Sequence, residues 1–257
     1  MPTQEFTRYE VRDAAAWITL NRPEARNALS AGLVTEFYDH LMVANADDAV
    51  RTIVITGAGK GFCAGADLKN PPGQRTGDER AVPFSDVLTQ IIEGAKPVIA
   101  AVNGAAFAGG LGIVGAADIV ITADEAVFSF SEVRIGVIPA IISVVCLPKL
   151  GRHHGTRLLL TGERFDGPAA VEYGLAHRSV PRADLDAAVR EELDTLNLAG
   201  PIALQECKKL VRLIPQGSLA EDFEFTGKWS REMFLSEEAS EGMAAFREKR
   251  SPAWVND

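Results

Sequence analysis

The sequence predicts an α/β fold over residues 1–195, followed by a helical region over residues 196–257. The first part carries apolar, β-branched runs, such as Thr-Ile-Val-Ile-Thr at 52–56, that alternate with segments of helical periodicity. Alternation of this kind favours a parallel sheet with helical crossovers. After about Pro181 the strand patterns stop. Four helical segments follow, at 183–196, 201–213, 219–235 and 237–248.

The N-terminal part of the chain predicts two short strands within residues 6–20, then a helix over 31–45. Ser30 precedes this helix and can accept a hydrogen bond from its first turn. A buried strand at 52–56 ends at the sequence Gly-Ala-Gly, which is typical of a turn. In the helix predicted at 31–45, one face is apolar and is formed by Leu33, Phe37, Leu41 and Ala44.

The middle of the chain begins with a polar tract rich in proline and glycine at residues 70–83, which predicts a loop that we expect to be mobile. Strand and helix patterns then resume. The predicted elements are a helix at 84–94, a strand at 97–102, a helix at about 109–117, a strand at 118–122 and a short strand at 127–130.

Composition and charge exclude several functional classes. The chain has 35 acidic against 26 basic side chains and a net charge of −9, so it lacks the basic stripe that nucleic-acid binding needs. Its three cysteines have no CxxC spacing, which argues against a disulfide framework or a zinc site and for a reducing, cytoplasmic compartment. The N-terminal residues contain no secretory signal pattern. The longest apolar stretch, residues 97–122, is interrupted by polar residues and glycines, so we expect no membrane span.

Two glycine-rich turns, residues 61–68 and 103–112, each follow a buried strand. Glycine and alanine at such turns let a ligand approach main-chain N–H groups closely. A helix that begins at Gly109 and Gly110 also presents unpaired N–H groups at the positive end of its dipole. If the turns converge, two N–H donors meet at one oxygen and form an oxyanion hole, in which one donor is worth roughly 3–4 kcal/mol of barrier. Glu132 follows an aromatic-rich strand, and a glutamate in an apolar pocket suits proton transfer near neutral pH.

Six motifs occur in order along nearly the whole chain. They are Leu-Asn-Arg-Pro at 20–23 with Asn-Ala-Leu at 27–29, Gly-Phe-Cys-Ala-Gly-Ala-Asp-Leu at 61–68, the second glycine-rich turn followed by Ala-Asp-Ile-Val, Phe-Ser-Glu-Val-Arg-Ile-Gly around Glu132, Leu-Thr-Gly-Glu at 160–163, and Phe-Arg-Glu-Lys-Arg at 246–250. Together they resemble the enoyl-CoA hydratase/isomerase (crotonase) family. The resemblance implies a spiral of strand–strand–helix units, with a C-terminal helical region that assembles a homotrimer or homohexamer.

The resemblance also implies roles for individual residues. The N–H groups of Ala64 and Gly109 are expected to hold the thioester carbonyl of a 2-enoyl-CoA and to stabilise an enolate. Glu132 matches one of the family's two catalytic glutamates. No metal or redox cofactor is expected, because the thioester itself is the electron sink. The residues expected to bind the acyl-CoA, with Arg26 at its nucleotide end and the last two on a C-terminal helix, are Arg26, Ala64, Gly65, Ala66, Asp67, Leu68, Gly110, Phe246 and Lys249.

The other catalytic glutamate is missing, because Gly112 stands where the hydratases commonly have it. Adding water needs one group to activate the water and one to handle the α-proton, whereas moving a double bond needs only one carboxylate. Residues 131–143 together with Gly112 resemble the bacterial methylglutaconyl-CoA hydratase-like branch, in which glycine also occupies this position. We therefore expect an enoyl-CoA hydratase. A Δ3-Δ2 enoyl-CoA isomerase is the close alternative, and a non-catalytic acyl-CoA binder is the third.

Simpler interpretations stand beside these roles. Gly109 and Gly110 can serve only to pack a helix against the sheet, and Asp67 can be a helix N-cap. Cys63 is expected to be a buried filler rather than a nucleophile. Residues 110–115 read GxGxxG, but too many residues separate this motif from the preceding strand for a dinucleotide site.

Overall fold

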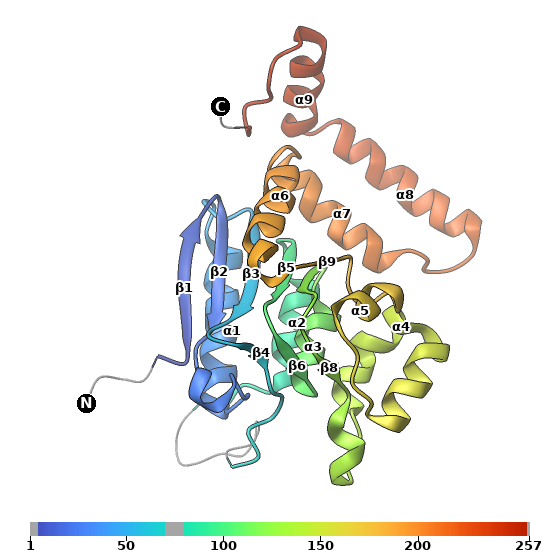
Figure 1. Cartoon of the computed structure of the whole chain (residues 1–257). Coiled ribbons are helices and arrows are strands. Elements are labelled where there is room, and N and C mark those ends of the chain that lie inside the picture. The colour runs from blue at the N-terminus through green and yellow to red at the C-terminus, as the bar shows by residue number, and fades with distance from the viewer. Residues whose placement is uncertain (1–4, 70–79, 256–257) are drawn as a thin grey trace.

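The computed structural model describes residues 5–69 and 80–255, so most of the loop predicted at 70–83 lies outside the described residues. The largest element is a six-stranded sheet in which β1 and β2 are antiparallel and all other neighbours are parallel (Figure 1). Its strands, in spatial order, are β1 (Thr7–Arg12), β2 (Ala15–Leu20), β3 (Thr52–Gly57), β5 (Val98–Val102), β7 (Ile119–Ala123) and β9 (Arg178–Val180).

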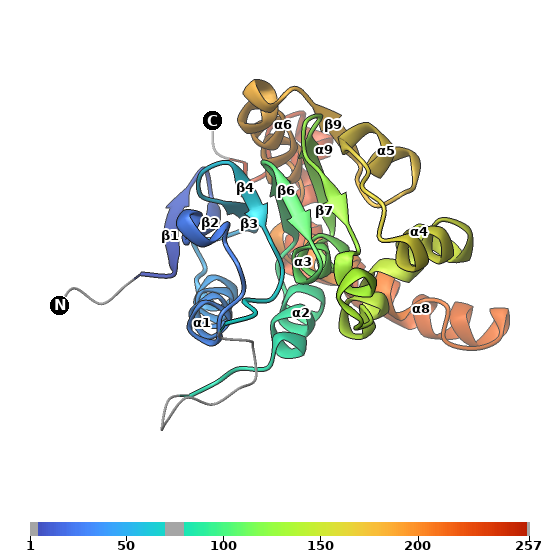
Figure 2. The same cartoon turned by 60° about the horizontal axis from the view of Figure 1, so that its bottom comes forward.

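A second, parallel sheet contains the three short strands β4 (Gly61–Cys63), β6 (Ala105–Phe107) and β8 (Phe128–Ser129). β4 and β6 run side by side in Figure 2. Each short strand follows a strand of the large sheet and precedes a helix, so the chain repeats a unit of two strands and one helix. This arrangement confirms the predicted α/β class and its spiral of repeated units. The helices that complete the units are α2 (Phe84–Glu93), α3 (Gly109–Ala116) and α4 (Ala140–Thr161).

Helices cover both faces of the large sheet. α1 (Ala31–Ala46) packs on one face through the predicted apolar stripe, which is buried. Ser30 caps this helix as predicted, because its Oγ accepts a hydrogen bond of 3.3 Å from the N–H of Leu33. α6 (Leu185–Asn197) covers the opposite face, where Val189 is fully buried against strand side chains. Strands buried on both faces carry continuous apolar runs rather than alternating patterns, as this sequence does.

Several elements after β8 have no counterpart in the sequence prediction. α4 is interrupted at Gly151, whose φ of 62° and ψ of 175° are not helical, and Pro148 precedes this kink. The break interrupts the helical spacing of apolar residues along α4, so the sequence shows no single long helical pattern there. α5 (Gly167–Glu172) and β9 are too short to show periodicity. Short 3₁₀ helices complete the chain: η1 (Pro23–Ala25), η2 (Ser131–Ile135) and η3 (Arg182–Asp184).

After α6 the chain leaves the sheet and forms a helical tail that extends away from it (Figure 1). The tail consists of α7 (Pro201–Leu213), α8 (Leu219–Phe234) and α9 (Glu237–Glu248), close to the predicted segments. Lys208 of α7 is buried and its Nζ lies 2.8 Å from Asp118 Oδ2, which ties the start of the tail to the sheet. No helix in the described part of the chain is long and apolar enough to cross a bilayer.

The start of α3 packs directly on β4. A Cβ added at Gly110 would lie 2.5 Å from the carbonyl oxygen and 3.0 Å from the Cβ of Cys63. Backbone atoms cannot move away as the end of a flexible side chain does, so glycine is required here for the helix to approach the strand.

We expect Gly110→Ala to lower the free energy of unfolding by about 1–3 kcal/mol, because the extra methyl group forces α3 away from β4. Gly227→Ala in α8 is the matched control, since its Cβ would meet only Arg231 Nη1 at 3.8 Å. Alanine also favours the helical state, so this variant should keep or raise stability. Thermal unfolding measures both changes, and equal melting temperatures would contradict the packing argument.

Candidate active site

A cavity of about 540 Å³ lies between the two glycine-rich turns, η2 and the start of α4. We call it the central cavity. Of the described side chains that line it, only those of Ser85 and Glu132 are polar. Its lining residues are Leu29, Ala66, Pro83, Phe84, Ser85, Gly109, Glu132, Ile138, Pro139, Ala140, Ile141 and Ile142.

The two glycine-rich turns do converge, as the sequence predicts. A Cβ added at Gly65 would lie 3.3 Å from the backbone nitrogen of Gly109 and 2.7 Å from the Cβ of Ala108. Gly65 also has a φ of 88°, which side chains other than glycine rarely adopt. The approach of the turns therefore depends on glycine at this position.

The structure corrects one of the two predicted oxyanion donors. The N–H of Ala64 already donates to the carbonyl oxygen of Arg26 at 3.0 Å, and Ala64 does not line the central cavity. The prediction that Ala64 binds the thioester oxygen is therefore wrong. Sequence reasoning could not find which amide of this turn is free, because the carbonyl that occupies the Ala64 N–H belongs to a segment far earlier in the chain.

Ala66, two residues later in the same turn, has its N–H available. It lines the central cavity, and its N–H has no acceptor among the described residues. Its neighbours are engaged instead, because Gly65 O accepts from Leu29 N at 2.8 Å and Asp67 N donates to Leu29 O at 3.0 Å. Gly109 is the first residue of α3, so its backbone N–H has no acceptor within the helix, and no side chain caps this end of the helix. Ala66 and Gly109 thus present two N–H groups to one cavity.

Glu132 lies in η2, directly after β8, and lines the same cavity. Its Oε2 atom is buried and finds no hydrogen-bond partner within residues 5–69 and 80–255. Burial raises the pKa of the Glu132 carboxyl above its ordinary value, opposed in part by a backbone hydrogen bond. A buried carboxyl with a free oxygen and a raised pKa can exchange a proton with a bound ligand near neutral pH.

The position of the missing glutamate is filled by apolar side chains. A Cβ added at Gly112 would lie 2.6 Å from Ile142 Cγ2 and 3.2 Å from Phe84 Cε1. No side chain fits at Gly112 until Ile142 of α4 moves. Glu132 is therefore the one carboxylate among the described residues that line the central cavity.

A second cavity, also of about 540 Å³, lies on the other side of the first turn, and we call it the basic cavity. Arg26, Lys60 and Ala64 line it, so the predicted site residues Arg26 and Ala64 are brought together here. Arg182 lies beside it and donates hydrogen bonds to Gly59 O at 2.7 Å and Lys60 O at 3.3 Å. Three cations thus gather around one cavity in a chain of net charge −9. Its complete lining is Pro23, Arg26, Gly59, Lys60, Gly61, Ala64, Ala105 and Phe107.

Six predicted binding residues line neither cavity: Gly65, Asp67, Leu68, Gly110, Phe246 and Lys249. Asp67 lines neither cavity: its Oδ2 pairs with Arg22 Nη1 at 3.0 Å, and its Oδ1 accepts a hydrogen bond from the N–H of Lys69 at 3.0 Å. Leu68 is 74% exposed. Phe246, which is 87% exposed, lies on α9, and Lys249 follows as the residue that ends this helix. Figure 1 shows α9 far from the short strands β4, β6 and β8, so a single chain does not bring its C-terminal residues to the site.

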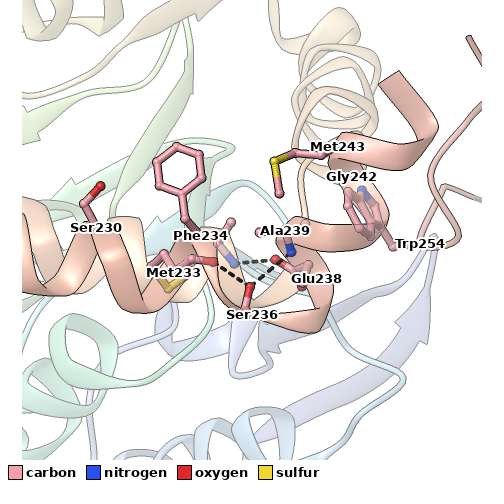
Figure 3. A pocket seen from close by; sticks show the side chains of 11 residues that line it. Ser230, Met233, Phe234, Ser236, Glu238, Ala239, Gly242, Met243 and Trp254 are labelled. Carbon is pink, nitrogen blue, oxygen red and sulfur yellow. Dashed lines mark hydrogen bonds between the residues drawn. The ribbon is translucent and has the colours of Figure 1, made fainter. Parts of the chain in front are cut away.

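The helical tail contains a pocket of its own, of about 360 Å³, between α8, α9 and the C-terminal segment (Figure 3). Apolar side chains dominate its lining, among them Met233, Phe234, Met243 and Trp254. Two of its polar side chains are already engaged: Ser236 Oγ caps α9, and the Glu238 carboxylate accepts N–H bonds from the start of α7. The pocket offers packing surface rather than chemistry.

Cys63 is fully buried, and burial raises the pKa of its thiol to about 12, so it carries no thiolate for nucleophilic attack. Within the described residues, no three His, Cys, Asp or Glu side chains gather as metal ligands do.

The chain is similar to known proteins in both sequence and fold. The family model described as enoyl-CoA hydratase/isomerase matches residues 10–257. The carnitinyl-CoA dehydratase of Proteus mirabilis is 35% identical over 256 residues, with 95% of each chain covered. Pseudomonas aeruginosa AtuE has a TM-score of 0.91 at 33% identity, covering 98% of this chain and 100% of its own. An enoyl-CoA hydratase from Shewanella pealeana has a TM-score of 0.89 at 29% identity, covering 98% and 97%.

The raised pKa of Glu132 predicts a pH-dependent stability effect. Burial disfavours the charged carboxylate, so the contribution of Glu132 to stability is largest below the ordinary glutamate pKa and is lost as pH rises through the folded-state value. Glu132→Gln removes the charge and should raise the melting temperature at pH 7–8, with a smaller gain near pH 4. Glu172→Gln, at an exposed position of α5, is the control and should show no such trend. A Glu132→Gln variant less stable than wild type at pH 8 would contradict the burial argument.

Proposed function

We propose, from the premise that this chain belongs to the enoyl-CoA hydratase/isomerase family and is an enzyme of it, that it adds water across the C2–C3 bond of a 2-enoyl-CoA thioester and catalyses the reverse. The observation that carries this proposal is the buried, unpartnered Oε2 of Glu132 in the same cavity as the N–H groups of Ala66 and Gly109. The two N–H groups can stabilise an enolate oxygen, and the Glu132 carboxyl can transfer the proton to and from C2.

The geometry supports the following sequence of steps. The thioester oxygen accepts hydrogen bonds from Ala66 and Gly109, each worth roughly 3–4 kcal/mol when the oxygen becomes an enolate. The Glu132 carboxylate takes a proton from water while the hydroxide adds at C3. The resulting carboxylic acid then returns that proton to C2, so one carboxyl serves both halves of the addition. No step requires a metal ion or redox cofactor.

The filled space over Gly112 favours a second candidate function. With Ile142 in the place of a further carboxylate, Glu132 is the one titratable side chain described in the central cavity. Moving a double bond between C3 and C2 requires removal and return of a single proton, which one carboxylate performs alone. A Δ3-Δ2 enoyl-CoA isomerase therefore uses the same amides and the same acid.

The basic cavity is proposed to bind the phosphates of coenzyme A. Arg26 and Lys60 line it, Arg182 lies beside it, and phosphate groups favour such cation clusters. The turn that carries Ala64 and Ala66 lies between the two cavities, so a thioester in the central cavity can extend over it toward the cations.

The residues that line the central cavity also predict the charge of the acyl group. Its described lining offers no cation to pair with a second carboxylate, such as that of 3-methylglutaconyl-CoA, so we expect an uncharged acyl chain. The relative named carnitinyl-CoA dehydratase supports removal of water from a CoA thioester as the general reaction.

We further propose that the chain assembles as a homotrimer or homohexamer through its tail and α4. Several large apolar side chains of these helices are exposed, and large exposed apolar patches mark association sites. The exposed side chains include Val144, Leu160, Val211, Phe223, Phe234, Leu235 and Phe246. In such an assembly Phe246 and Lys249 would reach a neighbouring subunit's acyl-CoA.

Product analysis in deuterated water tests the proposal. Wild type incubated with crotonyl-CoA should form 3-hydroxybutyryl-CoA carrying deuterium at C2. An isomerase would instead convert 3-enoyl-CoA to 2-enoyl-CoA, and a binder would convert neither. Glu132→Gln should lower kcat at least about 10²-fold while acyl-CoA affinity is unchanged. Activity that survives this substitution would remove Glu132 from its role. 3-Methylglutaconyl-CoA in the same assay tests the expectation of an uncharged acyl group.

The packing around Gly112 makes a second prediction. Gly112→Glu alone should destabilise the protein and lower turnover, because the new side chain collides with Ile142. Gly112→Glu combined with Ile142→Ala opens the space and should raise the ratio of hydration to isomerisation. Ile142→Ala by itself is the control. A single Gly112→Glu variant of full stability would show that the space is not filled as described.

A further inference from the structure

An ion pair lies directly behind the turn that carries Ala66. Arg22 Nη1 donates to Asp67 Oδ2 at 3.0 Å and to the carbonyl oxygen of Ala28 at 2.8 Å. The two charged side chains are only 13% and 12% exposed. Asp67 directly follows Ala66 in the chain, so the pair acts on the same short turn as the free amide.

Stability alone does not account for this pair. Removing two charges from water costs free energy that their mutual attraction often fails to recover, and apolar side chains of similar size are frequently as stable or more so. The Arg22 pair is also incompletely satisfied, since Nε is buried and has no partner among the described residues. The pair contributes little to stability and lies beside the free N–H of Ala66. A role in holding that N–H in position accounts for it.

The ion pair joins residues 26–29 to residues 64–67. The relative position of these two segments decides which backbone N–H of residues 64–67 is free. Arg22 reaches the carbonyl of Ala28 and the carboxylate of Asp67 with a single nitrogen. These segments run in parallel, linked by a bridge between Leu29 and Ala66. Asn27, which is fully buried, holds Arg22 in turn, because its Oδ1 accepts from the backbone N–H of Arg22 at 2.9 Å.

The segment needs such support because its backbone is strained. Arg26 and Asn27 have φ values of 53° and 56°, in the left-handed region that non-glycine residues rarely occupy. The side-chain amide of Asn27 also donates to Ala58 O at 3.0 Å and to Gly61 O at 2.9 Å, which ties the segment to the turn before β4 and to the first residue of β4.

We propose that Arg22 and Asp67 are positioning residues that aim the Ala66 N–H at the thioester oxygen. The inference rests on the proposed function, since the amide matters only when a carbonyl oxygen binds there. Hydrogen bonds weaken steeply as their angle departs from linearity, so a small rotation of this turn lowers enolate stabilisation more than it lowers ligand binding.

The test replaces the pair by apolar residues in the double variant Arg22→Met/Asp67→Leu, which avoids leaving one buried charge unpaired. Lys208→Met is the control, because it breaks a partly buried ion pair with Asp118, whose side chain is 30% exposed, away from both cavities. Each protein is measured for melting temperature, for kcat and KM with a 2-enoyl-CoA, and for the carbonyl stretching frequency of bound butyryl-CoA labelled with ¹³C at the thioester carbon.

We expect the double variant to have a kcat at least about 10-fold below that of wild type. The loss should be smaller than the 10²–10³-fold decrease typical of removing an oxyanion donor, because the Ala66 N–H is displaced and not removed. KM should stay within about threefold, and the carbonyl frequency should move toward that of free butyryl-CoA, at a melting temperature no lower than that of Lys208→Met. Lys208→Met should keep its kcat. The proposal is overturned if the double variant retains kcat and carbonyl frequency, or if Lys208→Met loses as much activity. Absence of turnover and of any carbonyl shift in wild type would instead count against the proposed function itself.

Discussion

The site depends on two backbone segments, residues 26–29 and 64–67, that run side by side in parallel. Their hydrogen bonds engage the amides of Ala64 and Asp67 and leave that of Ala66 free. A backbone N–H already bonded within the protein is not available to an incoming oxygen, so this pairing decides which atom of the turn can act on a ligand. The buried side chain of Asn27 holds the pairing in place from the opposite side.

The second sheet explains how three reactive groups reach one cavity. β4, β6 and β8 pair in parallel, so the chain segments that follow them emerge at the same edge. Ala66 follows β4, Gly109 follows β6 and Glu132 follows β8. Each turn of the spiral therefore contributes one group, and the repeated strand–strand–helix unit is itself the device that brings them together. Ligand sites at the carboxyl ends of parallel strands are a general consequence of this geometry.

The apolar lining of the central cavity has two effects with one cause. It raises the pKa of Glu132 by removing water, which suits the carboxyl for proton transfer and makes its charged form costly to the fold. The same lining places Ile142 over Gly112 and leaves no room for a further carboxylate. A site with one acid and two amides must use that acid for every proton it moves, so the two proposed reactions, hydration and double-bond migration, make the same demand on Glu132.

The sequence by itself determined the α/β class, the helices with clear periods, the positions of the two glycine-rich turns and the choice of Glu132 and Gly109 as candidate site residues. These features depend on neighbours in the chain: β-branched runs, glycine positions and helical spacing. The tertiary structure decided that Ala66 rather than Ala64 carries the free amide, that Asp67 pairs with Arg22, that Ile142 fills the space over Gly112, and that Phe246 and Lys249 lie far from the cavities of their own chain. Each of these depends on contacts between residues remote in sequence, and no local pattern records which remote segment will occupy a given hydrogen-bond donor or a given volume.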